Sequence, residues 1–460
     1  METTGHEAAQ AAASGNLYWI ACAIFVLSFA LIISEKVHKT KVALIGASAT
    51  ILIGILTQLE AFHSPHLGVD YNVIFLLISM MLIVNILGKS GAFEWTAVRL
   101  AKAAKGDPIT IMVFFFIATA VISAFLDNVT TVLLFAPVTL LIADELGLDP
   151  VPYLILEAIA SNIGGTATLI GDPPNLIIAS RAQLTFNDFI VHLAPGIIVM
   201  LIVFSFVVRF IFRKRFVVDQ EKKARVLAMD ESKLIKNPAL LKKAGFVLAV
   251  TILGFIAHGA LHLEPATIAL FGAALLLLIS GVEPQEVFAE VEWPTIFFFI
   301  GLFIVIGGIV KVGMVSDLSH FVIQLTAPTQ DSMFGTAMVM LWFSGFLSAF
   351  IDNIPYVATM APLVAEMAGT VVGNGAADAA TNPEVLHHAA VMPVWWALSL
   401  GACLGGNGTA IGASANVVVL GLAERAGRKV SFLEFMKFGL PMMIGSLVLS
   451  TAYLWVRYYL

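Results

Sequence analysis

SAFLDNVTTVLLFAP, residues 123–137, is answered later in the chain by SAFIDNIPYVATMAP, residues 348–362. A second matched pair follows in the same order. It consists of GGTATLIGDPPN at 164–175 and GGNGTAIGASAN at 405–416. The chain is therefore an internal duplication. Each copy sets an Asp-Asn pair and then a Gly/Thr-rich break inside apolar sequence. Paired breaks of this kind in two halves of a membrane protein point to a transporter's binding site.

The composition restricts the class of protein. Of the 460 residues, 59% are hydrophobic and 12% are charged, which is too apolar for a soluble core. The chain is expected to be a polytopic membrane protein. The net charge of −6 says little about partners, and nothing in the sequence suggests nucleic acid. The two cysteines have neither disulfide nor metal-ligand spacing.

Twelve apolar runs organise the chain, and eight of them read as plain membrane-crossing helices. The plain runs lie near residues 17–34, 42–59, 72–90, 189–212, 245–261, 266–282, 294–312 and 438–456. The four runs that carry the motifs are interrupted and lie near residues 110–143, 150–181, 335–367 and 391–424. The predicted fold is all-α and polytopic, with an inverted-topology repeat, two re-entrant hairpins and two broken helices.

The repeat and the charges also predict the domain boundaries. Residues 1–16 contain no Lys or Arg and no apolar core, so they are expected to form a short mobile tail. Residues 17–212 form the first repeat and residues 244–460 the second. Between them, residues 213–243 are expected to be a cytoplasmic basic linker.

The positive charges predict the orientation, because Lys and Arg are enriched in cytoplasmic loops. Basic clusters follow the first and third spans, fill the linker and precede the last span. All four lie in the cytoplasm if the hairpin of Asp127 enters from the cytoplasmic face and that of Asp352 from the outer face. The N-terminus then lies outside, the duplication is inverted, and the expected location is a prokaryotic inner membrane.

Asp127 and Asp352 are matched across the repeat, 225 residues apart, and each follows a long apolar run. A carboxylate at membrane depth without a cationic partner stays protonated or binds a cation. No Lys or Arg lies within either motif. Both aspartates are therefore candidates for coupling to H⁺ or Na⁺. The alternative is that each one caps the second helix of its hairpin, and the two roles are compatible.

The residue after each aspartate is an asparagine, Asn128 or Asn353, which offers a carbonyl acceptor and an amide donor. Thr130 extends this polar set in the first copy, whereas Pro355 takes that place in the second. These side chains are predicted to contact the solute. A coupling Na⁺, if there is one, is expected at Asp127, Asn128, Asp352 and Asn353.

The two breaks are predicted to supply the rest of the solute site. Glycines permit close approach and non-helical backbone, and half-helix ends direct N–H groups and carbonyls into a cavity. The predicted residues are Gly164, Gly165, Thr166, Thr168 and Asn175 in the first half and Gly405, Gly406, Asn407, Thr409 and Asn416 in the second. The alternative, small residues for tight helix packing, does not explain the matched threonines and asparagines.

Asp172 breaks the symmetry, because its partner in the second copy is Ala413. Two interpretations stay open. Asp172 is either a proton carrier for one gate and a third ion-coupling residue, or the cap of the helix that begins at Pro173.

The four motifs closely resemble those of the ion transporter superfamily. The resemblance is to the branch that holds ArsB-type arsenite-efflux permeases and the pink-eyed-dilution P protein, with a CitM-like transporter domain, and it covers nearly all of residues 17–460. It implies paired re-entrant hairpins in an inverted repeat, often dimeric, with an elevator-like or rocking motion. Related dicarboxylate transporters carry Ser-Asn-Thr at the hairpin tips. The aspartates in this chain would repel a dianion.

Several functions are compatible with this resemblance. The first is proton-linked efflux of a small inorganic solute, with arsenite or antimonite as the family's precedent, and the second is Na⁺/H⁺ antiport. Uptake of a dicarboxylate or other anion, or a channel with a filter at the breaks, ranks lower. We expect no enzymatic activity, catalytic residue, resident metal or cofactor beyond the coupling ion H⁺ or Na⁺. The expected partners are the solute, the lipid bilayer and a second copy of the chain in a homodimer.

Overall fold

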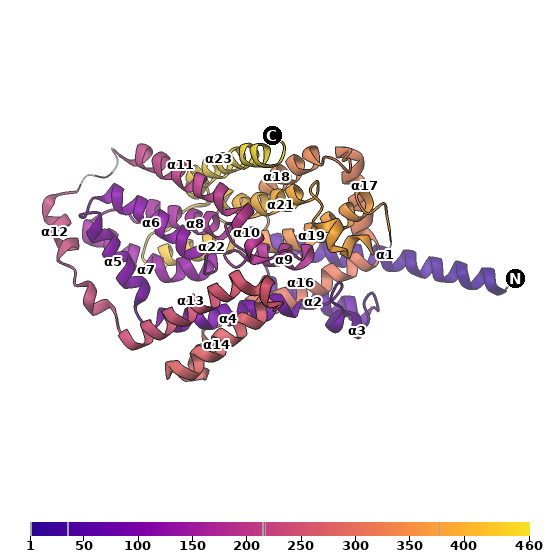
Figure 1. Cartoon of the computed structure of the whole chain (residues 1–460), viewed down its shortest axis with the longest axis horizontal. Helices are drawn as coiled ribbons and strands as arrows, with labels where there is room; N and C mark the ends of the chain where they lie inside the picture. The colour runs from indigo at the N-terminus through magenta and orange to yellow at the C-terminus, as the bar shows by residue number, and fades with distance from the viewer. Residues whose placement is uncertain (1, 35, 214–215, 217, 377) are drawn as a thin grey trace.

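The computed structural model describes residues 2–34, 36–213, 216, 218–376 and 378–460, and for residues 2–14 it describes the backbone alone. Within these ranges the chain forms helices and no strands, which confirms the predicted all-α class. Eight of the described helices are long and apolar enough to cross a membrane, and six of them lie in the predicted plain runs. The other two are the second arms of the hairpins, Asn128–Leu146 and Asn353–Val371. Most helices run along the long axis of the molecule (Figure 1).

The first half contains the predicted plain helices, hairpin, broken helix and closing helix. The plain helices are α1 (Glu2–Ser34), α2 (Lys39–Leu52) and α4 (Tyr71–Gly88). The hairpin is α6 (Pro108–Ser123) with α7 (Asn128–Leu146), the broken helix is α8 (Val151–Gly165) with α9 (Pro173–Ala182), and α11 (Ala194–Phe212) closes the half.

The second half repeats this order. Its plain helices are α13 (Pro238–Leu261), α14 (Pro265–Ser280) and α16 (Trp293–Lys311). Its hairpin is α18 (Phe334–Ser348) with α19 (Asn353–Val371), its broken helix is α21 (Met392–Gly405) with α22 (Ser414–Arg425), and α23 (Phe432–Tyr458) ends it. A single 3₁₀ turn, η3 (Gly406–Gly408), continues α21 into the break.

The two hairpins extend in opposite directions from the centre of the molecule. Figure 1 shows α6 and α7 on the left and α18 and α19 on the right. The two hairpin tips approach each other at the centre, where the side chains of Asn128 and Asn353 both reach Asp172. This opposed placement is the arrangement that an inverted repeat predicts.

Small residues let each hairpin pack closely on its broken helix. A Cβ added at Gly164 would lie 1.9 Å from the carbonyl oxygen of Ala120, and one at Gly405 would lie 2.5 Å from that of Gly345. Matched serines hold the same contacts. Ser123 donates to the carbonyl of Ser161 at 2.7 Å, and Ser348 donates to that of Ala402 at 2.6 Å. Tight helix packing is therefore one role of the glycines, as the alternative interpretation supposed.

Two of the predicted plain runs and the expected tail differ from the structure. The run at 266–282 forms α14, whose 16 residues make it shorter than the eight candidate spans. The run at 42–59 is not one span, because α2 ends at Leu52, the chain turns at Gly54 with a φ of 83°, and α3 (Gln58–His63) follows. In the expected mobile tail, the backbone from residue 2 onward is helical and continues α1, which projects from the body (Figure 1). The mobility of this segment stays a prediction.

Two amphipathic helices went unrecognised in the sequence. They are α5 (Ala92–Ala103) and α17 (Met314–Thr326). Each follows a glycine with left-handed backbone, Gly91 at a φ of 84° and Gly313 at 89°. Because a side chain is strained in that conformation, the matched glycines let the chain turn from a long helix into a short one.

The linker between the halves carries short helices, α12 (Gln220–Ala228) and η1 (Glu231–Leu234). It packs against α5 through Glu231, whose carboxylate pairs with Lys102 and with Arg99 at 3.2 Å. The hydrogen bond from Lys102 lowers the pKa of Glu231 below its ordinary value. The linker and the basic residues after the third span therefore lie on the same side of the molecule.

Candidate functional site

Asp172 lies where the two hairpin tips meet the first helix break. Its side chain is fully buried. Asn128, the first residue of α7, donates to its Oδ1 at 3.3 Å. Asn353, the first residue of α19, donates to Oδ1 at 3.4 Å and to Oδ2 at 3.3 Å. Asp172 stands at the start of α9, but its side chain makes no capping hydrogen bond, so the capping interpretation is wrong for this residue.

Capping is confirmed for the two matched aspartates. Oδ1 of Asp127 accepts from the backbone N–H of Thr130 at 2.9 Å, and Oδ1 of Asp352 accepts from that of Ile354 at 3.1 Å. A carboxylate at this position accepts a hydrogen bond from an otherwise free N–H group and is stabilised by the positive end of the helix dipole. Each aspartate keeps a second oxygen that its cap does not use.

The second oxygen of Asp352 has a cationic partner that the motif did not reveal. Nζ of Lys39 lies 2.6 Å from Oδ2 of Asp352, and the hydroxyl of Ser414 lies 3.2 Å from the same oxygen. We expected neither aspartate to have a basic partner, and for Asp352 this expectation is wrong. Among the described residues, no Lys or Arg forms an ion pair with Asp127.

A small cavity of about 30 Å³ lies between the tips, large enough for about one water molecule. Three carboxyl groups line it, those of Asp127, Asp172 and Glu292, together with the polar side chains of Asn128 and Asn353. Among the described residues that line it there is no Lys, Arg or His. Carboxyl groups that share one small cavity of low dielectric constant do not all stay ionised without a proton or a bound cation.

A chain of buried amides joins the two halves behind the cavity, and its central residue, Asn162 on α8, was missed from the sequence. Asn128 donates to its Oδ1 at 3.0 Å. Its own Nδ2 donates to Asn407 at 2.9 Å and to Asn416 at 3.1 Å. The only available signal was a polar residue in an apolar run, because the matched position in the second half is Cys403.

The matched threonines and asparagines brace the breaks. The hydroxyl of Thr168 donates to the carbonyl of Ala124, and the hydroxyl of Thr409 donates to that of Ala349. The amide nitrogens of the two asparagines bind carbonyls of their own breaks, at 2.8 Å from Asn175 to Thr168 and 2.9 Å from Asn416 to Thr409. These carbonyls are therefore already used, whereas we expected free backbone groups.

The remaining predicted residues divide between packing and polar contacts. Gly164, Gly165, Gly405 and Gly406 each lie where a Cβ would meet backbone atoms within 3 Å. The hydroxyl of Thr166 bonds the carbonyl of Asn162 at 2.7 Å. Thr130 serves through its backbone N–H.

Asn407 differs from the other buried amides of the site. Its Oδ1 accepts from Asn162, but its Nδ2 is buried without a partner among the described residues. A buried donor that makes no hydrogen bond costs about 1–3 kcal/mol, so Asn407 is the unsatisfied amide of this site.

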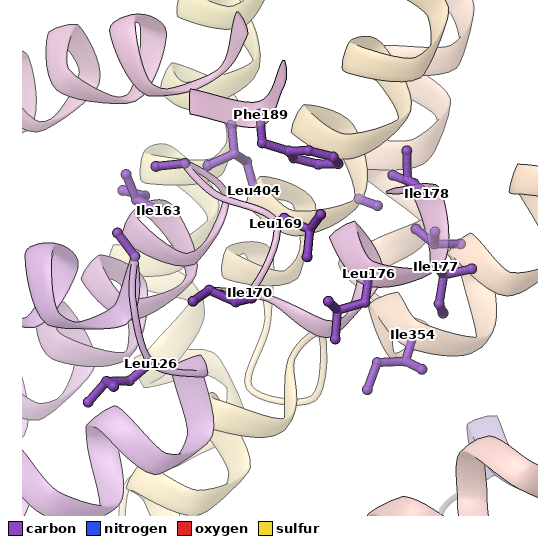
Figure 2. Packing of buried hydrophobic residues seen from close by; sticks show 14 of the residues in the cluster. Leu126, Ile163, Leu169, Ile170, Leu176, Ile177, Ile178, Phe189, Ile354 and Leu404 are labelled. Atoms are coloured by element: carbon purple, nitrogen blue, oxygen red, sulfur yellow. The ribbon is translucent and has the colours of Figure 1, made fainter. Parts of the chain in front are cut away.

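Apolar side chains hold the first break in place. Figure 2 shows Leu169 and Ile170 on the non-helical segment, between Ile163 of α8 and Leu176 of α9, with Ile354 of α19 close by. All five are buried. The break is therefore a packed, defined structure around a polar centre.

The far end of α9 borders a much larger cavity of about 600 Å³. Ile177, Ser180 and Arg181 of α9 line it, together with residues of α3, α16 and α19. The short helix α9 thus runs from the small carboxyl-lined cavity at Asp172 to a larger cavity with mixed polar and apolar lining.

Comparison with known proteins identifies the family. A family model described as a citrate transporter matches residues 29–401, which is most of the chain. The chain belongs to this citrate transporter family. The expected resemblance to the ion transporter superfamily is confirmed, and with it the coarser expectation of a membrane transporter.

Relatives of this citrate transporter family member cover nearly its whole length. An uncharacterised transporter of Mycobacterium tuberculosis is 47% identical over 440 residues, which are 96% of this chain and 98% of that protein. The human P protein is 32% identical over 515 residues, covering 95% of this chain and 60% of its own length. The crystal structure of the Alcanivorax borkumensis YdaH transporter superposes with a TM-score of 0.56 at 16% identity, over 97% of this chain and 98% of that chain. That likeness concerns the fold.

Proposed function

We propose that this family member is an ion-coupled secondary active transporter in which Asp172 takes up the coupling ion. The observation that carries the proposal is the buried Asp172 carboxylate, held by amides from both hairpin tips beside Asp127 and Glu292. A carboxyl group in this setting gains or loses a proton or cation when its surroundings change. Because both tips bind it, their movement and its ion occupancy are linked.

The solute that suits this site is small and carries no net negative charge. Two unit charges of the same sign 4 Å apart repel by about 4 kcal/mol at an effective dielectric constant of 20. A citrate anion, the substrate in the family's description, would meet this cost at several carboxylates. Neutral arsenite or antimonite, with hydroxyl groups for the amides, avoids it. Proton-linked efflux of arsenite or antimonite is therefore our first candidate.

Na⁺/H⁺ antiport is the second candidate. Carboxylate and amide oxygens are hard ligands of the kind that Na⁺ prefers, and the small cavity offers both. In this case Asp172 and Asp127 bind Na⁺ and H⁺ alternately, and no further solute is needed.

The test is transport into proteoliposomes that contain the purified protein. We expect arsenite flux that depends on an imposed pH gradient and collapses when a protonophore dissipates it. If Na⁺ or Li⁺ alone, without arsenite or antimonite, dissipates the pH gradient, the result favours Na⁺/H⁺ antiport. Citrate uptake driven by the gradient would overturn the choice of a neutral solute, and the absence of any flux coupled to H⁺ or Na⁺ would overturn ion coupling itself.

Two variants test whether Asp172 takes up the coupling ion. Asp172→Asn keeps the shape of the side chain and removes its charge, so coupled flux should fall to the level of empty liposomes. Asp144→Asn, an exposed aspartate on α7, is the matched control and should retain wild-type flux. Full coupled flux in Asp172→Asn would contradict the proposed role.

We further propose the placement that the basic clusters predict. The chain lies in a prokaryotic plasma membrane with its N-terminus outside and residues 213–243 in the cytoplasm, and it works as a homodimer. Cysteine labelling from either side of intact cells and mass measurement in detergent test these two points.

A further inference from the structure

The two hairpin tips are matched in sequence but differ in how their aspartates are satisfied. At the second tip, Asp352 faces the Lys39 ammonium at 2.6 Å and the Ser414 hydroxyl at 3.2 Å. At the first tip, the position matched to Ser414 is Pro173, which has no hydroxyl. Asp127 makes its cap with Thr130 and has no ion pair among the described residues. One tip thus holds a positive charge that belongs to the chain, and the other does not.

The surroundings of Lys39 are those of a bound cation. Its Nζ lies 2.6 Å from Asp352 Oδ2 and 3.0 Å from Ser414 Oγ, so a carboxylate and a hydroxyl oxygen face it from the hairpin and from the second break. The ring of Phe298 on α16 lies 5.0 Å away, within the range of a cation–π contact. The side chain of Lys39 is 27% exposed and that of Asp352 is 14% exposed. Oxygen ligands and an aromatic face would equally suit a free monovalent cation.

Lys39 belongs to a different part of the molecule from the groups that it binds. It is the first residue of α2, which packs along α16 and is tied to it where Thr40 donates to the carbonyl of Pro294 at 2.7 Å. Asp352 and Ser414 start α19 and α22. The ammonium group at the second tip is therefore supplied by a plain helix and not by the hairpin or the break that it contacts.

We propose that Lys39 is a built-in cation that fills the ion position at the second hairpin tip, so that the protein takes up one free coupling cation per cycle, in the cavity that Asp127 of the first tip and Asp172 line. The inference rests on the proposed function, because it assumes that the hairpin tips are where coupling ions bind. To the proposed function it adds the number of coupling cations taken up in each cycle, and it names Lys39 as the residue that sets this number.

The test replaces the ammonium and counts the ions. Lys39→Met removes the charge and keeps an apolar chain of similar length, which leaves Asp352 and Ser414 open to a free cation. Flux through this variant should then depend on the coupling cation, added as NaCl, LiCl or protons, with a Hill coefficient near two, where the wild type has about one. Lys39→Arg should keep a coefficient of about one. Lys41→Met, an exposed lysine of the same helix, is the matched control and should behave as wild type.

A double variant guards against a protein that fails to fold. Removing one partner of a partly buried pair leaves the other charge uncompensated, so Lys39→Met alone is expected to be the less stable protein. Lys39→Met with Asp352→Asn removes both charges and should restore stability together with a coefficient of about one. Cation-dependent thermal stability supplies a second count without transport, since each additional bound ion steepens the rise of the melting temperature with salt or proton concentration.

The outcomes separate this inference from the proposed function. A wild-type protein whose flux ignores H⁺, Na⁺ and Li⁺ contradicts the proposed function. If the wild type is coupled but Lys39→Met has the same Hill coefficient, only the role of Lys39 is contradicted. The same holds if Lys41→Met or the double variant raises the Hill coefficient as much as Lys39→Met does.

Discussion

Asn128 and Asn353, the matched residues of the two hairpin tips, donate hydrogen bonds to the same carboxylate, that of Asp172. The repeat supplies two amides related by pseudo-symmetry, but only one half supplies the acid, because the position matched to Asp172 is Ala413. Two hairpin tips related by pseudo-symmetry therefore bind one ionisable group, the carboxyl of Asp172.

Asn353→Ala should weaken coupled transport by roughly tenfold or more, because a hydrogen bond to a charged group contributes about 1.5–3 kcal/mol. The measurement is gradient-driven flux in proteoliposomes at equal protein content. Asn187→Ala, an exposed asparagine on α10 (Phe186–His192), is the control and should leave flux unchanged. Wild-type flux in Asn353→Ala would show that the second tip does not control Asp172.

Gly164→Ala should lower the thermal stability of the purified protein in detergent. The new Cβ would lie 1.9 Å from the Ala120 carbonyl oxygen, so α8 must move away from α6, and overpacking of this kind costs about 1–3 kcal/mol. Gly421→Ala on α22 has no atom within 4 Å of the new Cβ and should be neutral or slightly stabilising. Equal melting temperatures for the two variants would contradict the close packing.

Asn162→Leu should destabilise the protein more than it changes ion specificity. The substitution removes the acceptor of Asn128 and the donor to Asn407 and Asn416, and each buried group left unpaired costs about 1–3 kcal/mol. Asn85→Leu, which loses a single bond to the carbonyl of Glu290, is the comparison. The readouts are melting temperature and the cation dependence of flux, and a large shift in cation preference with full stability would contradict a structural role.

The docking of the linker on α5 should depend on pH through Glu231. Its pKa is lowered in the folded protein by the hydrogen bond from Lys102, so the contact adds stability above the ordinary carboxyl pKa of 4.5. This stability is lost as the pH falls through the lower, folded value. Hydrogen exchange of residues 229–236, corrected for intrinsic rates, should stay slow from pH 8 to about 5 and rise at lower pH.

Glu231→Gln should make that exchange fast already at neutral pH. Glu221→Gln is the matched control, because Glu221 pairs with Arg225 inside α12 and not with α5. The control should keep the wild-type profile. Exchange that is equally slow in Glu231→Gln and in the wild type would show that other contacts hold the linker.

Local chemistry and duplication made most of the fold predictable from the sequence. Apolar length gave the spans, and the Asp-Asn pairs gave the hairpin turns, because aspartate caps the helix that follows it. The glycine-rich segments gave the breaks. The amphipathic helices α5 and α17 escaped because a half-polar helix carries no spanning signal, although the matched glycines Gly91 and Gly313 marked their starts.

The site was predicted less completely because its contacts join residues far apart in the chain. Comparing the two copies finds what the duplication kept, and it therefore overlooked Asn162, whose counterpart is Cys403. Lys39 looked like a marker of orientation, and only the packing of α2 brings it to Asp352, which follows 313 residues later. Glu292 has no motif around it and reaches the cavity because α16 starts there.

The amide chain through Asn162 also bears on how the protein is made. Until the ribosome has synthesised the second half, Asn162 has no Asn407 or Asn416 to receive the two hydrogen bonds of its amide nitrogen. The first half thus reaches the membrane as an unfinished unit. Its polar core closes only when the last broken helix has been inserted, so late truncations of the chain are expected to be degraded rather than to accumulate as a stable half.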